Sequence, residues 1–340
     1  MKPFVLYRLP GEKAATRVSA SKTTALGSCC DLDGQSGFVI APFVPSSHEP
    51  ILLIEPEEMS EYIPRPDNGC AIDCQEGDAY ADREAYANTF AKFHQKLTDG
   101  TFRKVVLARQ KTVTLCAEAD AVSLFDRACA LYPRQMVVLV SAESCGTWLM
   151  ATPEILLQGR GLQWRTMALA GTMKAGEEGG GWSEKNIQEQ QLVASHIGEC
   201  LQSHAYDIHL QGPSTAHAGD LVHLKSDFTF HLRDEANVGH LLHDLYPTPA
   251  VCGLPKDATR QFIVHHEPKP RRYYSGFMGP LNINANATDL YVSLRCMALN
   301  GSHCTLYAGG GLISESNEQQ EWDETEAKMR TMLRCINGQM

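Results

Sequence analysis

Lys104 is a candidate general base. It is followed by Val105, Val106 and Leu107. On a strand, alternation would place it on one face with Val106, while Val105 and Leu107 occupy the other face. Burial among such neighbours disfavours an ammonium and makes a neutral amine available as a base. A lysine near a strand end can instead extend its side chain to water, and the pattern alone leaves both interpretations open.

Glu154 is a candidate general acid. Pro153 removes a backbone donor where a strand would begin. Glu154 then opens the apolar run Ile155-Leu156-Leu157. A carboxyl group buried there would have a raised pKa and could deliver a proton to a leaving group. An exposed glutamate at the start of a strand is the alternative.

Acidic residues on two predicted helices could meet over a metal ion. Glu321, Glu324 and Lys328 are spaced i, i+3 and i+7 and therefore share one helix face. Glu189 borders the apolar stripe of another predicted helix. Mg²⁺ typically takes one or two protein carboxylates together with water and substrate oxygens. Acids early in a helix can also do no more than complement its dipole.

Two glycine segments and two further polar residues could bind an anion. Residues 170–172 (Ala-Gly-Thr) and 309–311 (Gly-Gly-Gly) would let backbone amides approach a ligand closely. Neither segment fits a P-loop or a dinucleotide fingerprint. Arg295, on a predicted strand, could bind a carboxylate with both arms of its guanidinium, and His223 could assist. Turn glycines, a solvated arginine and a structural histidine are the alternatives.

The elements that must position these residues are strands in hairpins, with long helices between groups of strands. This pattern predicts an α+β fold rather than alternating βαβ units. Asn300-Gly301 is a strong hairpin turn signal. We expect helices over residues 85–97, 121–130, 183–204 and 317–336. We expect strands over residues 37–43, 51–54, 103–115, 135–142, 147–158, 164–170, 228–232, 273–279, 290–298 and 304–308.

Composition excludes several classes of protein. The 340 residues are 43% hydrophobic and 21% charged, as in a soluble globular chain. No apolar run approaches the ~20 residues that span a bilayer, and the start lacks a secretory signal. A net charge of −10 makes nucleic-acid binding unexpected. The twelve cysteines include the spaced pair Cys70 and Cys74, which no second pair answers at zinc-site spacing. We therefore expect a cytoplasmic protein with reduced, mostly buried thiols.

Taken together and in order, these motifs resemble the chorismate-utilising enzymes. That family includes the isochorismate, salicylate, anthranilate and aminodeoxychorismate synthases. The resemblance covers about residues 85–335, and the first 85 residues match it only loosely. The matching segments are residues 104–109, 152–154, 168–172, 185–189, 223–224, 245–255, 273–276, 294–295 and 308–328.

The resemblance implies two facing antiparallel sheets with outer helices and a site in the cleft between the two halves. Residues 1–85 would be an N-terminal scaffold that adds strands to the same fold, and residues 86–340 the chorismate-binding catalytic core. Aminodeoxychorismate synthases carry a nucleophilic lysine immediately before the Gly-Thr, where this chain has Ala170. Together with the anthranilate synthases, they typically lack a lysine at position 104. This chain therefore looks like an isochorismate synthase or, as the alternative, a salicylate synthase.

The resemblance also implies roles for residues. Lys104 would be the base and Glu154 the acid, with Mg²⁺ held by Glu189 and Glu324 and by Glu321 through water. The substrate chorismate would be bound by Gly171, Thr172, His223, Tyr274, Arg295, Gly309, Gly311 and Lys328.

Three positions depart from the family pattern. An acid, a histidine and a serine are usual where this chain has Asn186, Gln190 and Thr152. The short chain leans toward isochorismate synthase, and the presence of both acid and base disfavours a non-catalytic chorismate-binding regulator. We expect a monomer that serves menaquinone or siderophore biosynthesis.

Overall fold

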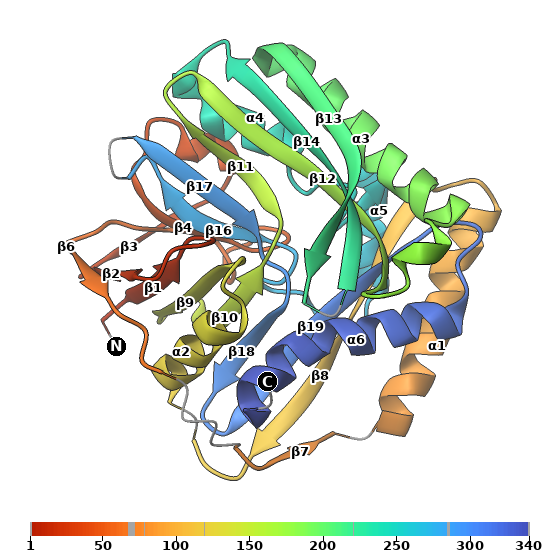
Figure 1. Ribbon diagram of the computed structural model, residues 1–340, viewed down its shortest axis with the longest axis horizontal. Helices are drawn as coiled ribbons and strands as arrows, with labels where there is room; N and C mark the ends of the chain where they lie inside the picture. Colours follow the sequence, from red (N-terminus) through yellow and green to blue (C-terminus); the bar gives the residue numbers. More distant parts are fainter. Residues whose placement is uncertain are drawn as a thin grey trace.

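Two antiparallel sheets face one another, and helices lie on their outer sides (Figure 1). The computed structural model describes residues 2–66, 72–77, 79–118, 120–219, 221–283 and 286–338. Within these residues, the described ladders join antiparallel neighbours, from the first strand pair to the last. The predicted α+β fold with two facing antiparallel sheets is therefore confirmed.

The first sheet carries the strand that begins at Lys104. Its order is β15-β8-β19-β18-β10-β9-β1-β2-β6, with β7 paired to β8. In that order the strands are Gly253–Leu254, Lys104–Leu115, His303–Leu312, Cys296–Asn300, Gly146–Thr152, Met136–Ala142, Phe4–Arg8, Ala15–Ser19 and Glu58–Tyr62, with Cys74–Glu76 as β7.

The second sheet carries the strand that precedes helix α3. Its order is β13-β14-β12-β11-β17-β16-β4-β5-β3. In that order the strands are Ala205–Ala218, Leu221–Leu232, Gln163–Lys174, Ile155–Arg160, Ala287–Val292, Phe277–Leu281, Gly37–Ala41, Ile51–Ile54 and Thr23–Leu26. Strands from the first 85 residues thus lie in both sheets, while the proposed boundary at residue 85 stays a prediction.

Three of the described helices begin at polar caps. Side chains of Asp120, Ser183 and Asn317 accept hydrogen bonds from backbone amides at the starts of α2, α3 and α6, as N-caps do. Helix α3 covers the second sheet, and α1, α2 and α6 cover the first (Figure 1). The helices are α1 (Ala79–Thr98), α2 (Ala121–Leu131), α3 (Glu184–His204), α4 (Val238–Leu245), α5 (Lys256–His266) and α6 (Glu318–Asn337).

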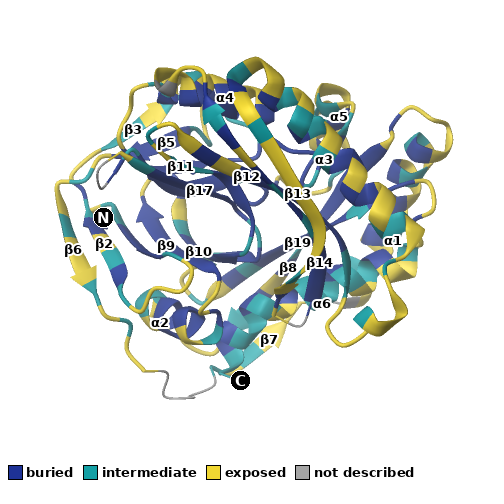
Figure 2. Ribbon diagram, turned by 45° about the horizontal axis from the view of Figure 1, so that its top comes forward, coloured by how far each residue is buried: buried dark blue, intermediate teal, exposed yellow. Residues whose placement is uncertain are grey.

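The main core lies between the sheets. Large side chains from both sheets interdigitate there, among them Phe38, Trp148 and Tyr291. Figure 2 shows the inner strands as buried, whereas β13 is exposed along most of its length. The described cysteines are free thiols, most of them buried, and Cys70 lies outside the described residues. Within those residues, every helix is too short or too polar to cross a bilayer.

Two segments predicted as single strands are broken, and these predictions were wrong. Residues 147–158 split into β10 of the first sheet and β11 of the second. Residues 290–298 split into β17 of the second sheet and β18 of the first. At residues 152–155 and 292–296 the chain thus passes directly from a strand of one sheet to a strand of the other, and we call these two segments the paired crossings. Their backbones are joined by hydrogen bonds from Ala151 N to Arg295 O at 3.1 Å and from Val292 N to Glu154 O at 3.0 Å.

Other boundaries moved for local reasons. The predicted hairpin at Asn300-Gly301 is confirmed, with Gly301 at φ +59°. The triplet of glycines at 309–311 lies inside β19 and not after it, because β8 pairs with the strand along its whole length. The strand predicted at 273–279 starts at Phe277. The long hairpin of β13 and β14 was recognised only at its end, because β13 shows no alternation of buried and exposed residues.

Candidate active site

A pocket beside the paired crossings brings most of the predicted site residues together. It encloses about 610 Å³ of space outside the protein atoms, part of it open to solvent. The predicted residues that line it are Glu154, Gly171, Thr172, Glu189, His223, Tyr274, Arg295, Gly309, Gly311 and Lys328. Lys104, Glu321 and Glu324 do not line it but contact residues around it.

Glu154 lies at the first crossing and is only 2% exposed. Burial raises the pKa of its carboxyl group to about 8, although the charges of Lys104, Lys328 and Arg295 act in the opposite direction. The side chain is therefore mostly protonated at neutral pH. A protonated carboxyl group facing a pocket can donate a proton to a ligand.

Arg295 lies at the second crossing with a φ of +46°. The prediction that it projects from a strand was wrong, because β17 ends before it and β18 begins after it. Its side chain is 6% exposed, and its guanidinium donates a hydrogen bond to His223 Nε2 at 2.9 Å. This buried cation is thereby held in one orientation at the pocket wall.

His223 is a neutral link between Arg295 and the second sheet. Burial and, to a smaller extent, the charges of Arg295 and Lys328 together lower the pKa of its imidazole to about 3. A guanidinium only donates hydrogen bonds, so Nε2 must be the acceptor and Nδ1 carries the proton. Nδ1 then donates to the backbone oxygen of Gly171 at 3.1 Å.

Gly171 occupies a bulge in β12 that only glycine fits well. The ladder between β12 and β14 shifts register there, and Gly171 has a φ of +75°. A Cβ at this position would lie 3.0 Å from the backbone oxygen of Asn186. The side chain of Asn186 donates to the oxygen of Thr172 at 3.3 Å, so this departure from the family pattern supports the bulge.

Lys104 is completely buried, so the interpretation that it extends to water is wrong. Its Nζ lies 3.1 Å from Glu189 Oε1 but makes no well-aligned hydrogen bond with the described residues. Its Cε is 2.9 Å from the point where a Cβ on Gly311 would lie. The amine therefore reaches the edge of the pocket behind Glu189 and Gly311.

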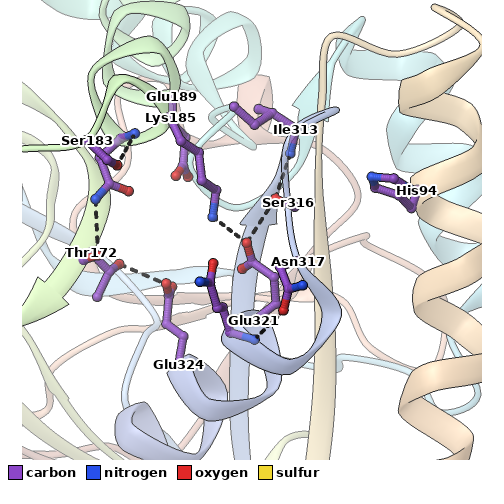
Figure 3. A network of polar contacts seen from close by, with 12 residues as sticks. His94, Thr172, Ser183, Lys185, Glu189, Ile313, Ser316, Asn317, Glu321 and Glu324 are labelled. Carbon is purple, nitrogen blue, oxygen red and sulfur yellow. Dashed lines mark hydrogen bonds and ion pairs between the residues drawn. The ribbon is translucent and has the colours of Figure 1, made fainter.

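The three glutamates predicted to bind metal each face a lysine. Figure 3 shows one of these pairs, in which Lys185 points toward Glu321. Glu324 also accepts a hydrogen bond from Thr172 Oγ1 at 3.1 Å. Glu321 Oε1 accepts from Ser316 at 2.8 Å, whereas its Oε2 is buried without a hydrogen-bond partner in the described structure. The ion pairs are Lys104 with Glu189, Lys185 with Glu321, and Lys328 with Glu324.

Glu321 and Glu324 have opposite pKa shifts. Burial and the neighbouring charge of Glu324 together raise the pKa of Glu321 to about 7, although the charge of Lys185 acts in the opposite direction. Burial would raise the pKa of Glu324 as well, but the ammonium groups of Lys328 and Lys185 bring it down to about 2. Glu324 is thus the permanently charged member of the pair, and Glu321 can hold a proton near neutral pH.

The carboxylates converge on glycines of β19. A Cβ on Gly310 would lie 2.7 Å from Glu321 Oε2 and 3.8 Å from Glu324 Oε1. A Cβ on Gly311 would lie 2.0 Å from Glu189 Oε1. In this arrangement, however, no group of three His, Cys, Asp or Glu side chains among the described residues is placed to hold a metal. The carboxylate oxygens suit a hard cation, but here each glutamate is paired with a lysine instead.

Gly309 provides the remaining contacts of this wall. Lys328 Nζ donates to the oxygen of Gly309 at 2.8 Å. The hydroxyl of Tyr274 lies 2.9 Å from the point where a Cβ on Gly309 would lie. The ring of Tyr274 stacks on Tyr307, with centroids 5.5 Å apart. A side chain at 309 would separate these groups.

Sequence reasoning gave no site role to two residues that the structure places here. Tyr307 lines the pocket; its position next to Ala308-Gly309 on a predicted strand was the available signal. Lys185 pairs with Glu321, and its position four residues before Glu189 was a signal as well. Of the other two departures from the family pattern, Gln190 donates to Ala168 O at 3.0 Å and Thr152 is fully buried.

Comparison with known proteins identifies relatives of this chain. Residues 63–337 match the family described as "Chorismate binding enzyme". Isochorismate synthase MenF of Escherichia coli K12 is 30% identical over 266 residues, which cover 75% of this chain and 61% of the relative. Isochorismate synthase EntC of the same strain is 31% identical over 240 residues, covering 68% and 61%. The chain thus spans about three fifths of the length of these relatives.

A solved structure shares the fold. The structure of the menaquinone-specific isochorismate synthase MenF from Escherichia coli superimposes with a TM-score of 0.83 at 22% identity. The superposition covers 99% of this chain and 89% of that one. The two-sheet architecture is therefore common to both chains.

Proposed function

The chain belongs to the family of chorismate-binding enzymes, and on this basis we propose that it is an isochorismate synthase. It would add water at C2 of chorismate while the C4 hydroxyl leaves. The observation that carries the proposal is the pairing of a buried, proton-bearing Glu154 with a pocket edge that presents the Lys104 amine. The relatives MenF and EntC bear the name of this activity.

Glu154 is proposed to protonate the leaving group. With a pKa of about 8 it still carries a proton at neutral pH. Hydroxide is a poor leaving group, so the C4–O bond breaks as the Glu154 proton moves to that oxygen. Both ring double bonds shift at the same time, from C1=C2 to C1=C6 and from C5=C6 to C4=C5, and a water molecule is released.

Lys104 is proposed to deprotonate the attacking water. The bond between water oxygen and C2 forms as one proton passes to Nζ. Uptake of this proton requires an uncharged amine, so the contact of Nζ with Glu189 Oε1, now 3.1 Å, has to open first. Lys104 itself and Val106, its neighbour on the same strand face, are buried, which keeps bulk water away from the amine.

Arg295 is proposed to bind a carboxylate of the substrate. It is buried, and its orientation is fixed by the neutral His223. Tyr274, Gly171, Thr172, Gly309, Gly311 and Lys328 would complete the recognition of the dianion. A buried guanidinium without a carboxylate partner is costly, which supports an anionic ligand at this wall.

Glu189 and Glu324 are the proposed ligands of Mg²⁺, with Glu321 acting through water. The unpartnered Oε2 of Glu321 and the bare glycines beside it suit a hard cation with oxygen ligands. When bound, Mg²⁺ would supply positive charge to the ring carboxylate and compete with the lysines for the glutamates. The protein residues would orient the substrate and exchange its protons.

A product assay tests the function. We expect chorismate with Mg²⁺ to give isochorismate, identified by chromatography. Salicylate with pyruvate would instead identify a salicylate synthase, and binding without turnover would identify a regulator. A cytoplasmic location, a monomeric state and service to menaquinone or siderophore synthesis are proposed with the activity.

A further inference from the structure

A second pocket adjoins the active-site pocket. It lies between α1, β8 and residues 267–271, and it encloses about 570 Å³ outside the protein atoms, part of it open to solvent. Ala108 and Tyr307 line both pockets. In Figure 1, α1 lies alongside β8 on the flank of the molecule away from the paired crossings. The proposed reaction assigns no role to the residues that line this second pocket.

Arg109 presents an unused donor in the second pocket. Its Nε donates to Thr325 Oγ1 at 2.6 Å, and its Nη2 pairs with Glu326. Its guanidinium carbon lies 3.7 Å from the centre of the Trp322 ring. Nη1 is buried and has no hydrogen-bond partner in the described structure. The guanidinium is thus fixed in place with one arm free.

Tyr86 presents a second unused group. The residue is 3% exposed, and its buried hydroxyl has no hydrogen-bond partner in the described structure. Its ring packs edge-on against Trp322, with centroids 5.3 Å apart, so the hydroxyl cannot swing freely to water. Leaving a buried hydroxyl unsatisfied destabilises a protein, and a ligand that accepts its proton would remove that cost.

The acidic groups of the pocket leave these donors free. Glu267 accepts hydrogen bonds from Ala108 N at 2.8 Å and from Arg271 at both oxygens, so its charge is already balanced. Asp82 and Lys269 are the other charged lining residues and have opposite signs. The remaining surface is largely apolar, with Leu107 and Tyr307 among its residues.

We propose that this pocket is a second binding site, which takes a small carboxylate with an apolar, ring-sized body. The carboxylate accepts from Arg109 Nη1 and the Tyr86 hydroxyl, and the body lies against Leu107, Ala108 and Tyr307. Since Tyr307 also stacks on Tyr274 in the active-site pocket, occupancy of one pocket alters the affinity of the other. By linkage the effect is reciprocal.

Benzoate is a suitable probe, with benzamide as its uncharged counterpart. We expect saturable benzoate binding by calorimetry or ligand-observed NMR, and at least tenfold weaker binding of benzamide. Arg109→Gln should weaken benzoate binding at least tenfold, and Tyr86→Phe about threefold to tenfold. The matched control is Arg83→Gln, because Arg83 also lies over the Trp322 ring, at 5.2 Å, yet does not line the pocket. It should bind benzoate as the wild type does.

Two further measurements on variants distinguish the possible outcomes. Arg295→Gln removes the carboxylate partner in the active-site pocket and should leave benzoate binding to the second site unchanged. Tyr86→Phe should melt at the same or a higher temperature than the wild type, because it deletes a hydroxyl without a partner. A lower melting temperature would mean that the hydroxyl is structural and would overturn its assigned role. Absence of saturable binding, or binding lost only in Arg295→Gln, would overturn the second site.

Discussion

The two walls of the active-site pocket are built differently. At the paired crossings, Glu154, Arg295 and His223 are held by backbone pairing between the crossings and by hydrogen bonds of fixed direction. The other wall is formed by Glu189 and bare glycines of β19, and behind it the glutamates of α3 and α6 face lysines in ion pairs. The first wall is preorganised, whereas the second holds partners that a cation could displace. Preorganisation serves recognition and proton donation, and exchangeable pairs serve binding of a metal.

The largest expected effect is on the exchangeable wall. Chelation should abolish turnover, and Mg²⁺ should restore it, because the substrate is a dianion and the wall is acidic. Glu324→Gln should have the same outcome at any Mg²⁺ concentration. The matched control is Glu326→Gln, since Glu326 is also a glutamate of α6 paired with basic residues, but its partners Arg109 and Lys111 do not line the pocket, whereas the partner of Glu324, Lys328, does. Full activity in excess chelator would show that the lysines alone balance the charge.

Lys104 should rank next. Lys104→Ala should lose nearly all hydroxyl transfer in both directions while chorismate still binds, measured by chromatography and by calorimetry. Lys104→Arg should fail as well, because a guanidinium does not give up its proton in this pH range. Lys111→Arg on the same strand, whose lysine pairs with Glu76 and Glu326, should remain active. An active Lys104→Arg enzyme would reduce the lysine to a source of charge.

Glu154→Gln tests the preorganised wall. Loss of a general acid should lower kcat by about 10²–10⁴ with little effect on chorismate binding. In the wild type, activity should fall as pH rises through about 8, where Glu154 loses its proton. A glutamine variant with near-normal kcat would assign the leaving-group proton to another residue.

The same variant should differ in stability with pH. The pKa of Glu154 is raised in the folded protein, so its contribution to stability is complete below the unfolded pKa and is lost as pH rises toward about 8. The wild-type free energy of unfolding should thus fall relative to Glu154→Gln, by up to about 1.4 kcal/mol per pH unit in that window. Denaturant unfolding at pH 5 and pH 8 measures the difference. If the difference in free energy of unfolding between the wild type and Glu154→Gln were the same at both pH values, the raised pKa would be contradicted.

Arg295→Lys should have the smallest kinetic effect. Lysine keeps the charge but cannot reproduce the fixed fork or the contact with His223. We expect KM for chorismate to rise about tenfold to a hundredfold, in line with the loss of a hydrogen bond to a charged group, while kcat changes less. A large fall in kcat with unchanged KM would move Arg295 from binding to chemistry.

Local sequence patterns predicted the elements whose pattern agrees with their packing. The strand that begins at Lys104, the hairpin at Asn300-Gly301 and the cap of α3 at Ser183 are examples. The crossing at 152–155 was missed although Pro153 marks the start of a strand there, because only pairing with distant strands shows that the two parts of residues 147–158 belong to different sheets. The exposed strand β13 was missed because its residues do not alternate between buried and exposed positions.

The residues of the candidate site were gathered mainly by the family resemblance. The structure brings ten of these predicted residues together around one pocket. The position of Arg295 between strands, and the lysine partners of the glutamates, depend on contacts between α3, α6 and β19. Such contacts have no local signature, so Lys185 and Tyr307 received no role. The second pocket was beyond prediction for the same reason, since its donors Tyr86 and Arg109 come from separate elements.

The paired crossings also have a mechanical consequence. Because the backbones of the two crossings are hydrogen-bonded to each other, they connect the two sheets at adjacent points. Sliding of one sheet over the other would carry Glu154 and Arg295 as one body and leave their separation unchanged. The same sliding would change the separation between Lys104 on the first sheet and Thr172 on the second. When a ligand binds, movement of the sheets would therefore change the distance between Lys104 and Thr172 and leave the distance between Glu154 and Arg295 unchanged.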